Sequence, residues 1–275
     1  MRDRDRRLIL SAPAAARPRS LAEHPGDALR YDTAEISLVG HRAENQDRVA
    51  VVRRRDGVFL VVVDGMGGHA DGGRAAEVAT DSLATTFANA PSTIDDPGEF
   101  LTQAVLRAHA AVVGIGEGLL IDEKPRATCA TCLVLDGHAW WAHVGDARIY
   151  LLRAGQVVRR TRDHSHVEVL LRDGVITEEE VAGHPMRHYV ECCLGGESAM
   201  PELGEPGETA LQSGDVILVC SDGLWSGVPD DEIAASAAGA GGLEQWLGQL
   251  SDRAVSVNAP HSDNTSAAAA RLIDG

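Results

Sequence analysis

Apolar positions along the chain follow two different periods from about residue 36 onward. Short β-favouring apolar runs, too short for helices, predict strands at residues 36–39, 49–52, 58–63 and 216–220. Apolar residues at helical spacing predict amphipathic helices around residues 75–87, 101–112 and 243–254. Residues 127–160 carry repeated turn signals and predict consecutive strands, followed by a helix near 165–172. This order favours a layered α+β domain over strict βαβ alternation.

The composition excludes several classes of protein. The chain has 275 residues, 44% of them hydrophobic, so it can bury a full core and is not disordered throughout. A net charge of −16 disfavours binding to nucleic acid or to an anionic membrane through a basic surface. No apolar stretch reaches the ~18–20 residues of a membrane span, and the three apolar residues after the basic N-terminus are too few for a signal-peptide core.

The cysteines suggest in which compartment the protein works. Five cysteines in a chain of this length do not form a disulfide framework, so we expect reduced, partly buried thiols in a cytoplasmic protein.

The N-terminal segment differs from the rest of the chain. Residues 1–30 hold seven arginines against four acidic residues, with three prolines and an alanine run. Such a segment buries too little surface to offset its ordering entropy, so we expect a flexible tail ahead of one domain at 31–275.

The most informative chemical feature is a pair of Asp-Gly sequences, each at the end of a buried-type apolar run. Asp64-Gly65 follows one run, and Asp222-Gly223 follows the other after a single serine. A buried carboxylate is costly unless it is paired or binds a cation, and the adjacent glycine lets the backbone turn sharply. A lone Asp-Gly is more often an ordinary turn. If the two strands are neighbours, however, both carboxylates reach one place.

Three more acids lie beside predicted strands: Asp47, Asp146 and Asp263. Each alone could be a solvated loop charge or, for Asp263, a local cap. Taken together, they form an all-oxygen ligand set, which suits hard cations such as Mg²⁺ or Mn²⁺.

The motifs around these acids resemble, in order, those of the metal-dependent protein phosphatases (PPM, or protein phosphatase 2C family) of bacteria. Residues 40–47 (GHRAENQD) resemble the first motif, with an arginine five residues before the aspartate, and residues 64–69 (DGMGGH) match the second almost literally. Residues 142–150 (AHVGDARIY), 221–225 (SDGLW) and 263–264 (DN) resemble the later motifs. The resemblance runs from about residue 36 to residue 272.

The resemblance implies a four-layer α-β-β-α sandwich: a central antiparallel β-sandwich, helices on both outer faces, and a mobile flap at about 163–195 beside the active site. It also implies two Mn²⁺ or Mg²⁺ ions, with a third held more weakly. Asp64 would bridge two metals. The Gly65 carbonyl oxygen would bind one of them, and Asp222 and Asp263 would complete the ligand shell of the other. Asp47 would act through metal-bound water, and Asp146 would hold the third ion together with Asp222.

The implied activity is hydrolysis of phosphoserine and phosphothreonine in proteins by a metal-activated water. Arg42 would bind the substrate phosphate through two parallel hydrogen bonds. The expected substrate is a phosphoprotein made by a bacterial Ser/Thr kinase, with no nucleic-acid or membrane partner. No cysteine is followed by arginine six positions later, so the thiol-phosphatase signature is absent.

Two positions depart from the family pattern. Met66 stands where some relatives carry a histidine proposed as the proton donor, and a thioether cannot donate a proton. The flap sequence at 191–195 lacks an arginine often found before its Leu-Gly.

The sequence leaves two alternative functions open. One alternative is a catalytically weak, phosphoprotein-binding regulatory module of the same fold, although the intact ligand set argues against it. The other is a phosphatase dedicated to a single signalling protein.

Overall fold

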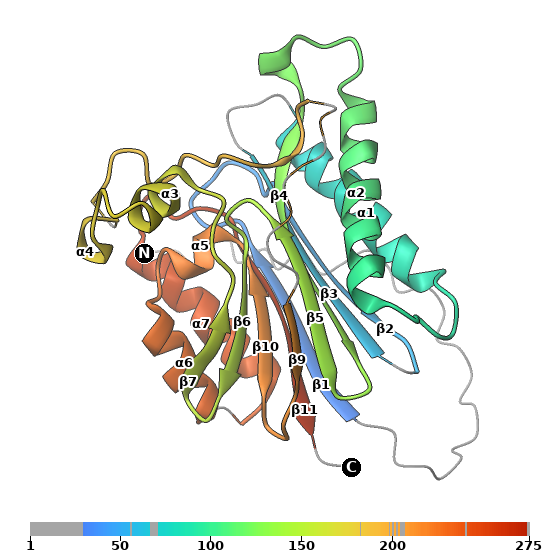
Figure 1. Ribbon diagram of the computed structural model, residues 1–275. Helices are drawn as coiled ribbons and strands as arrows, with labels where there is room; N and C mark the ends of the chain where they lie inside the picture. Colours follow the sequence, from blue (N-terminus) through green and yellow to red (C-terminus); the bar gives the residue numbers. More distant parts are fainter. Residues whose placement is uncertain are drawn as a thin grey trace, which may run out of the picture.

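The computed structural model describes residues 30–55, 57–66, 71–181, 183–197, 199, 201, 203, 207–239 and 241–273. In these residues two antiparallel sheets pack face to face, and helices cover the outer face of each (Figure 1). The predicted four-layer α-β-β-α sandwich is therefore confirmed. The predicted tail, residues 1–30, lies outside the described residues except for Arg30, whose backbone begins the first strand.

The two sheets draw their strands from distant parts of the chain. In spatial order, the first sheet contains β1 (Arg30–Leu38), β11 (Thr265–Ile273), β10 (Val216–Cys220), β6 (Arg148–Arg153) and β7 (Gln156–Arg160). The second contains β2 (Asp47–Arg53), β3 (Gly57–Gly65), β4 (Arg126–Leu135), β5 (His138–Val144) and β9 (Gly207–Ala210), and the short β8 (Leu194–Gly195) also pairs with β4.

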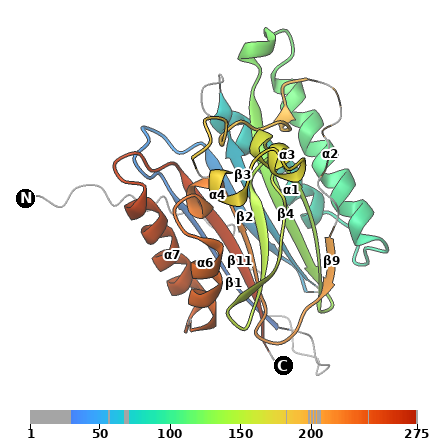
Figure 2. The same ribbon diagram turned by 60° about the vertical axis from the view of Figure 1, so that its left-hand side comes forward.

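Each sheet has its own pair of long helices. On the second sheet lie α1 (Gly72–Ala88) and α2 (Pro97–Ile115), the latter started by Asp96, whose side chain accepts a hydrogen bond from the Glu99 N–H. The short η1 (Ile121–Glu123) follows α2. On the first sheet lie α6 (Asp230–Ala238) and α7 (Leu243–Val257), preceded by the one-turn α5 (Asp222–Trp225) (Figure 2).

Three apolar clusters hold these layers together, one under each helical layer and one between the sheets. In β3, Phe59, Val61 and Val63 face the helices α1 and α2, whereas Leu60 and Val62 face the other sheet. A strand buried on both faces needs apolar residues at successive positions, which explains the unbroken run at 58–63. The two sheets are thereby fixed relative to each other, and so are the loops at their ends.

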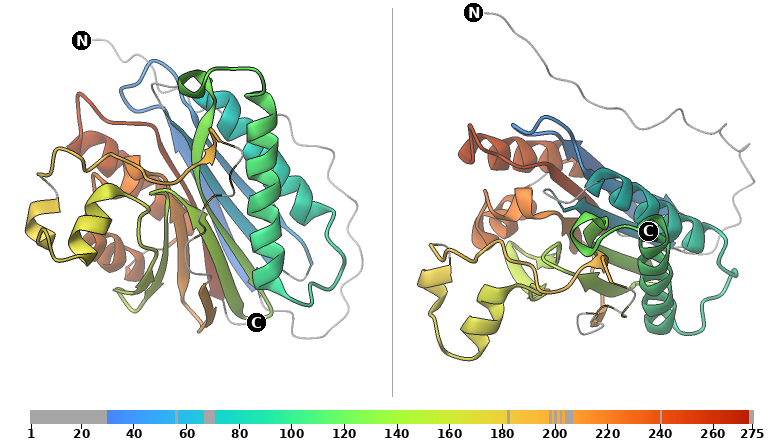
Figure 3. Two further views of the ribbon diagram at one scale, coloured as in Figure 1. Left: turned by 45° about the horizontal axis from the view of Figure 1, so that its top comes forward. Right: turned by 90° about the horizontal axis from the view of Figure 1, so that it is seen from above.

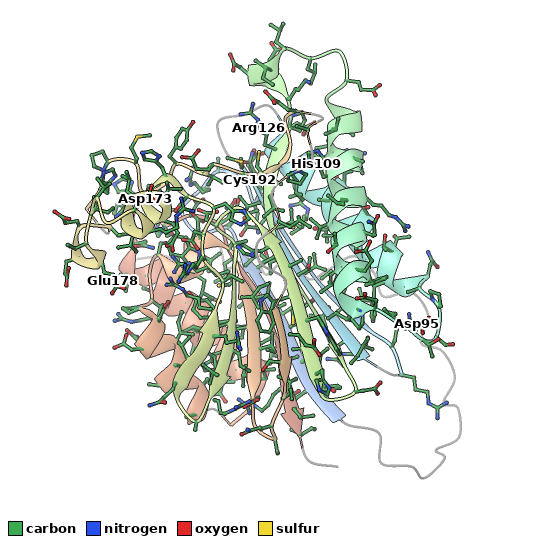
Figure 4. The ribbon with its side chains drawn as sticks, in the orientation of Figure 1. Asp95, His109, Arg126, Asp173, Glu178 and Cys192 are labelled. Carbon is green, nitrogen blue, oxygen red and sulfur yellow. The ribbon has the colours of Figure 1, made fainter. Side chains whose placement is uncertain are left out.

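A small subdomain stands off the end of the sandwich, at the place predicted for the flap. It contains α3 (His166–Arg172), as the sequence predicted, and α4 (Glu178–Val181) (Figure 3). Figure 4 shows Asp173 and Glu178 at the outer part of this subdomain, whereas Cys192 lies where the chain returns to β4. The chain rejoins the second sheet through β8, which pairs with β4.

Candidate active site

The five predicted acids lie at one end of the sandwich, in elements of both sheets. Asp47 begins β2 and is the direct cross-strand partner of Asp64 in β3, so both carboxylates lie on the same face of the second sheet. Asp146 lies in the turn between β5 and β6, Asp222 begins α5, and Asp263 lies just before β11. The fold therefore brings together side chains that are up to 216 positions apart in the sequence.

The arrangement of the two Asp-Gly strands differs from the simplest expectation. β3 and β10 are not neighbours in one sheet but belong to different sheets. Asp64 and Asp222 meet across the sandwich: the Asp222 charge helps to raise the pKa of Asp64, whereas a side-chain hydrogen bond with Asp64 opposes the rise in the pKa of Asp222. The predicted convergence is therefore present, but it depends on sheet-on-sheet packing rather than on strand pairing.

The acids line a cleft of about 820 Å³ between the sandwich and the flap. Its walls include four of the predicted acids, Asp64, Asp146, Asp222 and Asp263, together with Arg42. The flap contributes Val167, Glu178, Val181, Arg187, His188 and Val190. A cleft of this size, lined by a few convergent charged groups, is typical of a binding or catalytic site.

Close backbone packing explains the glycines beside the acids. A Cβ on Gly65 would lie 2.2 Å from the Gly72 carbonyl oxygen, and a Cβ on Gly223 would lie 2.0 Å from that of Asn264. The rest of the glycine-rich motif, residues 67–69, lies outside the described residues. Glycine at these two positions thus lets neighbouring backbone approach the acidic cluster.

Asn264 joins the loops at the edge of the cleft, a role that sequence reasoning missed. Its Nδ2 donates to the carbonyl oxygens of Val39 and Glu44, both at 2.9 Å, and its Oδ1 accepts from the Gln46 N–H at 2.8 Å. These bonds hold the segment that carries Arg42 and Asp47 against the segment that carries Asp263. The only signal in the sequence was the Asp-Asn pair itself, which does not reveal partners more than 200 residues away.

Burial and mutual repulsion dominate the electrostatics of the acids. Burial raises the pKa of Asp47 to about 6, although Ser221 Oγ donates to Asp47 Oδ2 at 2.8 Å. Burial, together with the Asp163 carboxylate, raises the pKa of Asp146 to about 7. The pKa values of Asp64 and Asp222 lie well above the ordinary range, first because of burial and then because of the neighbouring carboxylates. Such a cluster of acids calls for a compensating positive charge.

The residues fit a divalent cation on two grounds. Among the described residues, nothing hydrogen-bonds to the buried Asp47 Oδ1 atom, and the other carboxylate oxygens present a hard, anionic donor set. In the described residues, no three His, Cys, Asp or Glu side chains close on a single point. Asp263 accepts hydrogen bonds from Arg42 and from the Asn264 N–H instead. The acids therefore line one anionic cleft without being drawn around a single centre.

Arg42 lies at the open side of this cleft. Its Nη2 donates to Asp263 Oδ2 at 2.6 Å, and 56% of its side chain is exposed. The carboxylate orients the guanidinium and leaves its remaining N–H donors available. A planar guanidinium held in this way can bind two oxygens of a phosphate.

A buried arginine, also missed by sequence reasoning, ties the base of the flap to the cleft. Arg148 binds both carboxylate oxygens of Asp163, at 2.8 and 2.7 Å, and its guanidinium lies 3.6 Å from the ring centre of Trp225. Trp225 Nε1 in turn donates to the Asp146 carbonyl oxygen at 3.0 Å. The turn that carries Asp146 and the helix that begins at Asp222 are thus joined to the flap. The arginine was visible in the motif at 142–150, but its partner was not.

Comparisons with known proteins agree with this geometry. The family model described as protein phosphatase 2C matches residues 39–259. The chain belongs to the protein phosphatase 2C family. Protein phosphatase PhpP of Streptococcus pneumoniae is 32% identical over 209 residues, which cover 72% of this chain and 82% of that protein. Serine/threonine protein phosphatase PstP of Mycobacterium tuberculosis is 33% identical over 210 residues, or 73% of this chain and 39% of that protein.

Solved structures show the same relationship. The Streptococcus agalactiae serine/threonine phosphatase superposes with a TM-score of 0.80 at 25% identity, covering 88% of this chain and all of that one. The catalytic domain of PstP, in complex with two manganese ions, gives a TM-score of 0.73 at 30% identity, covering 90% and 99%. This member of the protein phosphatase 2C family is accordingly a metal-dependent serine/threonine protein phosphatase, a hydrolase, as the sequence predicted. In the described residues, no helix is long and apolar enough to cross a membrane.

Proposed function

We propose that the cleft is the active site, that it belongs to a catalytic domain spanning residues 31–275, and that its acids hold two Mn²⁺ or Mg²⁺ ions, with a third bound more weakly. The proposed ligands are the carboxylates of Asp47, Asp64, Asp146, Asp222 and Asp263 and the carbonyl oxygen of Gly65. The observation that carries this proposal is that carboxylates from both sheets raise one another's pKa in one cleft beside Arg42.

When bound, such ions supply a water of lowered pKa and neutralise charge on phosphoryl oxygens. Arg42 binds two non-bridging phosphate oxygens and orients the phosphoryl group above Asp64 and Asp222. The Asp263 carboxylate keeps the Arg42 guanidinium in place through the 2.6 Å bond. Met66 lines the same cleft and has no proton to donate, so this chain leaves protonation of the alcohol product to another group.

The proposed substrate is a phosphoserine or phosphothreonine in a bacterial protein, placed there by a Ser/Thr kinase in the cytoplasm. The open side of the cleft supports a macromolecular substrate, because Arg42 is more than half exposed and the flap forms one wall. Three cysteines, Cys129, Cys132 and Cys220, are buried thiols, and burial raises the pKa of Cys129 to about 12. Reduced thiols of this kind suit a cytoplasmic protein.

The test is hydrolysis of an aryl phosphate and of a phosphothreonine peptide with Mn²⁺, with and without a chelator. Asp64→Asn and Asp222→Asn should each lose at least 10²-fold in kcat on both substrates, because each removes a charge from the cation site. Asp81→Asn, at an exposed position of α1, is the matched control and should retain full activity. Activity that survives the chelator, or that survives both cleft substitutions, would refute the proposed mechanism.

A further inference from the structure

The flap turns an apolar wall toward the cleft. Val167, Val181 and Val190 all line the cleft, and they come from three separate segments of the flap: α3, the end of α4, and the stretch that leads to β8. Val167 is buried, whereas the side chains of Val181 and Val190 are half-buried. Three branched apolar side chains therefore converge on one cavity from a subdomain whose sequence is otherwise rich in charged residues.

Backbone hydrogen bonds hold this wall in place relative to the acids. Val190 pairs with Ser165 in an isolated antiparallel bridge, and the neighbouring residues add N–H···O bonds of 2.7 and 2.9 Å. Ser165 directly precedes α3, which carries Val167. The His164 N–H in turn donates to the Gly145 carbonyl oxygen at 2.8 Å, in the turn between β5 and β6 that carries one of the acids. The wall and the acidic floor thus belong to one connected unit.

The sandwich contributes an aromatic surface to the same cleft. Figure 1 shows the flap helices α3 and α4 next to α5, whose last residue, Trp225, is half-buried and lines the cleft. The Arg148 guanidinium lies 3.6 Å from the centre of its ring, and its Nε1 donates to the Asp146 carbonyl oxygen at 3.0 Å. Because the indole is held at both its face and its edge, it presents a fixed apolar surface. A group that enters the cleft meets apolar atoms from the flap and from the sandwich.

The phosphate itself has no use for these apolar side chains. Its oxygens suit Arg42 and the acid-lined floor, and an apolar wall offers a phosphate no hydrogen bond. Residues next to the phosphorylated one enter the same cleft of about 820 Å³, and contact between apolar surfaces is favourable in proportion to the area removed from water. An acidic side chain there is repelled by the carboxylates, which include Glu178 of the flap.

We infer that the flap valines and Trp225 form a specificity subsite for an apolar side chain within two residues of the phosphoserine or phosphothreonine. Val181 and Val190 contact this side chain from the flap, and the Trp225 ring contacts it from the sandwich. The inference rests on the proposed function and adds the class of substrate: phosphoprotein segments with a leucine-like residue beside the phosphorylated position.

A set of phosphothreonine peptides tests the subsite in the wild-type protein. The peptides share one sequence and carry leucine, glutamine or aspartate in turn at each of the two positions before and after the phosphothreonine. With Mn²⁺, kcat/KM for a leucine peptide should exceed that for the matching glutamine peptide about tenfold at one or more positions, and aspartate should be poorest. Isothermal titration calorimetry with non-hydrolysable phosphonate analogues should give the same order in Kd, because the preference arises from binding.

Isosteric substitutions assign the preference to the valines. Val181→Thr and Val190→Thr each exchange a methyl for a hydroxyl of nearly the same shape. The double variant should raise KM for the preferred leucine peptide about fivefold and change KM for the glutamine peptide about twofold or less. Val175→Thr is the matched control, because Val175 lies on the same flap, is 66% exposed and does not line the cleft, and it should keep the full preference. Melting temperatures within about 2 °C of the wild type show that the variants fold.

The outcomes separate this inference from the proposed function. If the wild-type protein neither binds nor hydrolyses any phosphopeptide, the proposed function itself is wrong. If it hydrolyses the peptides but treats leucine and glutamine alike at all positions, the subsite is refuted and the proposed function stands. A leucine preference that survives in the double variant, or that Val175→Thr abolishes equally, would also overturn the inference, because the apolar side chain would then bind elsewhere.

Discussion

Without metal, the folded protein should become less stable as the pH rises from 6.5 to 8. The pKa of Asp146 is raised to about 7, and those of Asp64 and Asp222 are raised well above the ordinary range, so the folded state retains protons that the unfolded state has already lost. A raised carboxyl pKa contributes stability that is fully present below the unfolded value of about 3.8 and is lost as the pH rises through the folded value. The loss therefore extends into the neutral range.

Histidines act in the opposite direction. Burial lowers the pKa of His143 to about 4, and it also lowers the pKa values of His109, His164 and His188, so these groups contribute stability that is present above the unfolded value of about 6.5 and is lost as the pH falls through it. Buried thiols such as Cys129 have a raised pKa, and they contribute a loss only above about pH 8, where unfolded cysteine ionises. His188 also lines the cleft, so comparing the wild type with Asp146→Asn isolates the contribution of a carboxyl.

The size of the effect follows from the number of retained protons. Each proton that only the folded state holds costs about 1.4 kcal/mol of stability per pH unit. A single carboxyl with a pKa of about 7, such as Asp146, gives about 0.8 kcal/mol between pH 6.5 and 8. The raised pKa values of Asp64 and Asp222 contribute a loss of the same sign. A loss of about 0.8 kcal/mol alone corresponds to a melting temperature lower by roughly 2–3 °C.

Differential scanning calorimetry of chelator-treated protein at constant ionic strength measures this trend. Saturating Mn²⁺ should flatten it, because a bound cation keeps the carboxylates ionised in the folded state. Asp146→Asn should make the metal-free protein more stable at pH 8 and reduce the slope, whereas the exposed Asp81→Asn should change neither. If the stability difference between Asp146→Asn and the wild type does not grow from pH 6.5 to 8, the Asp146 carboxyl does not titrate as described, and the reasoning about the acidic cluster is wrong.

Three further substitutions test other parts of the site. Gly65→Ala should lower the free energy of unfolding, measured by urea denaturation, by about 3 kcal/mol, since its Cβ would lie 2.2 Å from a backbone carbonyl oxygen. The control Gly114→Ala has no neighbouring atom within 4 Å of its Cβ and should raise the free energy of unfolding by about 0.5–1 kcal/mol. Arg148→Ala should lower the free energy of unfolding by about 3–5 kcal/mol, because it leaves the Asp163 carboxylate, which is 8% exposed, buried and unpaired. A decrease below about 1 kcal/mol would contradict this. Met66→His should raise kcat on a phosphothreonine peptide by a factor more than tenfold larger than on an aryl phosphate, whose leaving group needs no proton. Equal factors on both substrates would argue against a missing proton donor.

The elements that the sequence predicted well are those whose apolar pattern is set by burial. β3 is buried on both faces and gives an unbroken apolar run, and α7 shows a clear stripe that includes Trp246 and Leu250. Helix α6 was not predicted, because it buries only Ile233, Ala234 and Ala237. Alanine adds little to an apolar pattern, so a short helix of this kind does not stand out from a loop.

The sequence predicted a list of candidate site residues but not their geometry. The acids and Arg42 were identified through motifs, whereas the meeting of β3 and β10 across two sheets depends on packing that no local pattern encodes. The same is true of the polar contacts that support the acids. Ser221 Oγ reaches Asp47 across 174 positions, and Asn264 reaches Val39 across 225. A hydrogen bond between such distant residues leaves no periodicity in the sequence.

The division of the proposed ligands between two sheets means that the proposed cation site needs the whole fold. Asp47 and Asp64 belong to the second sheet, Asp263 precedes a strand of the first, and Asp222 begins a helix packed on that sheet. Neither sheet alone presents the full set, so cations should bind the native state and not the unfolded chain. Binding of this kind stabilises the fold by mass action, about 2.7 kcal/mol at a hundredfold excess over Kd. The repulsion that weakens the metal-free sandwich at neutral pH thus arises from the arrangement that makes it bind cations.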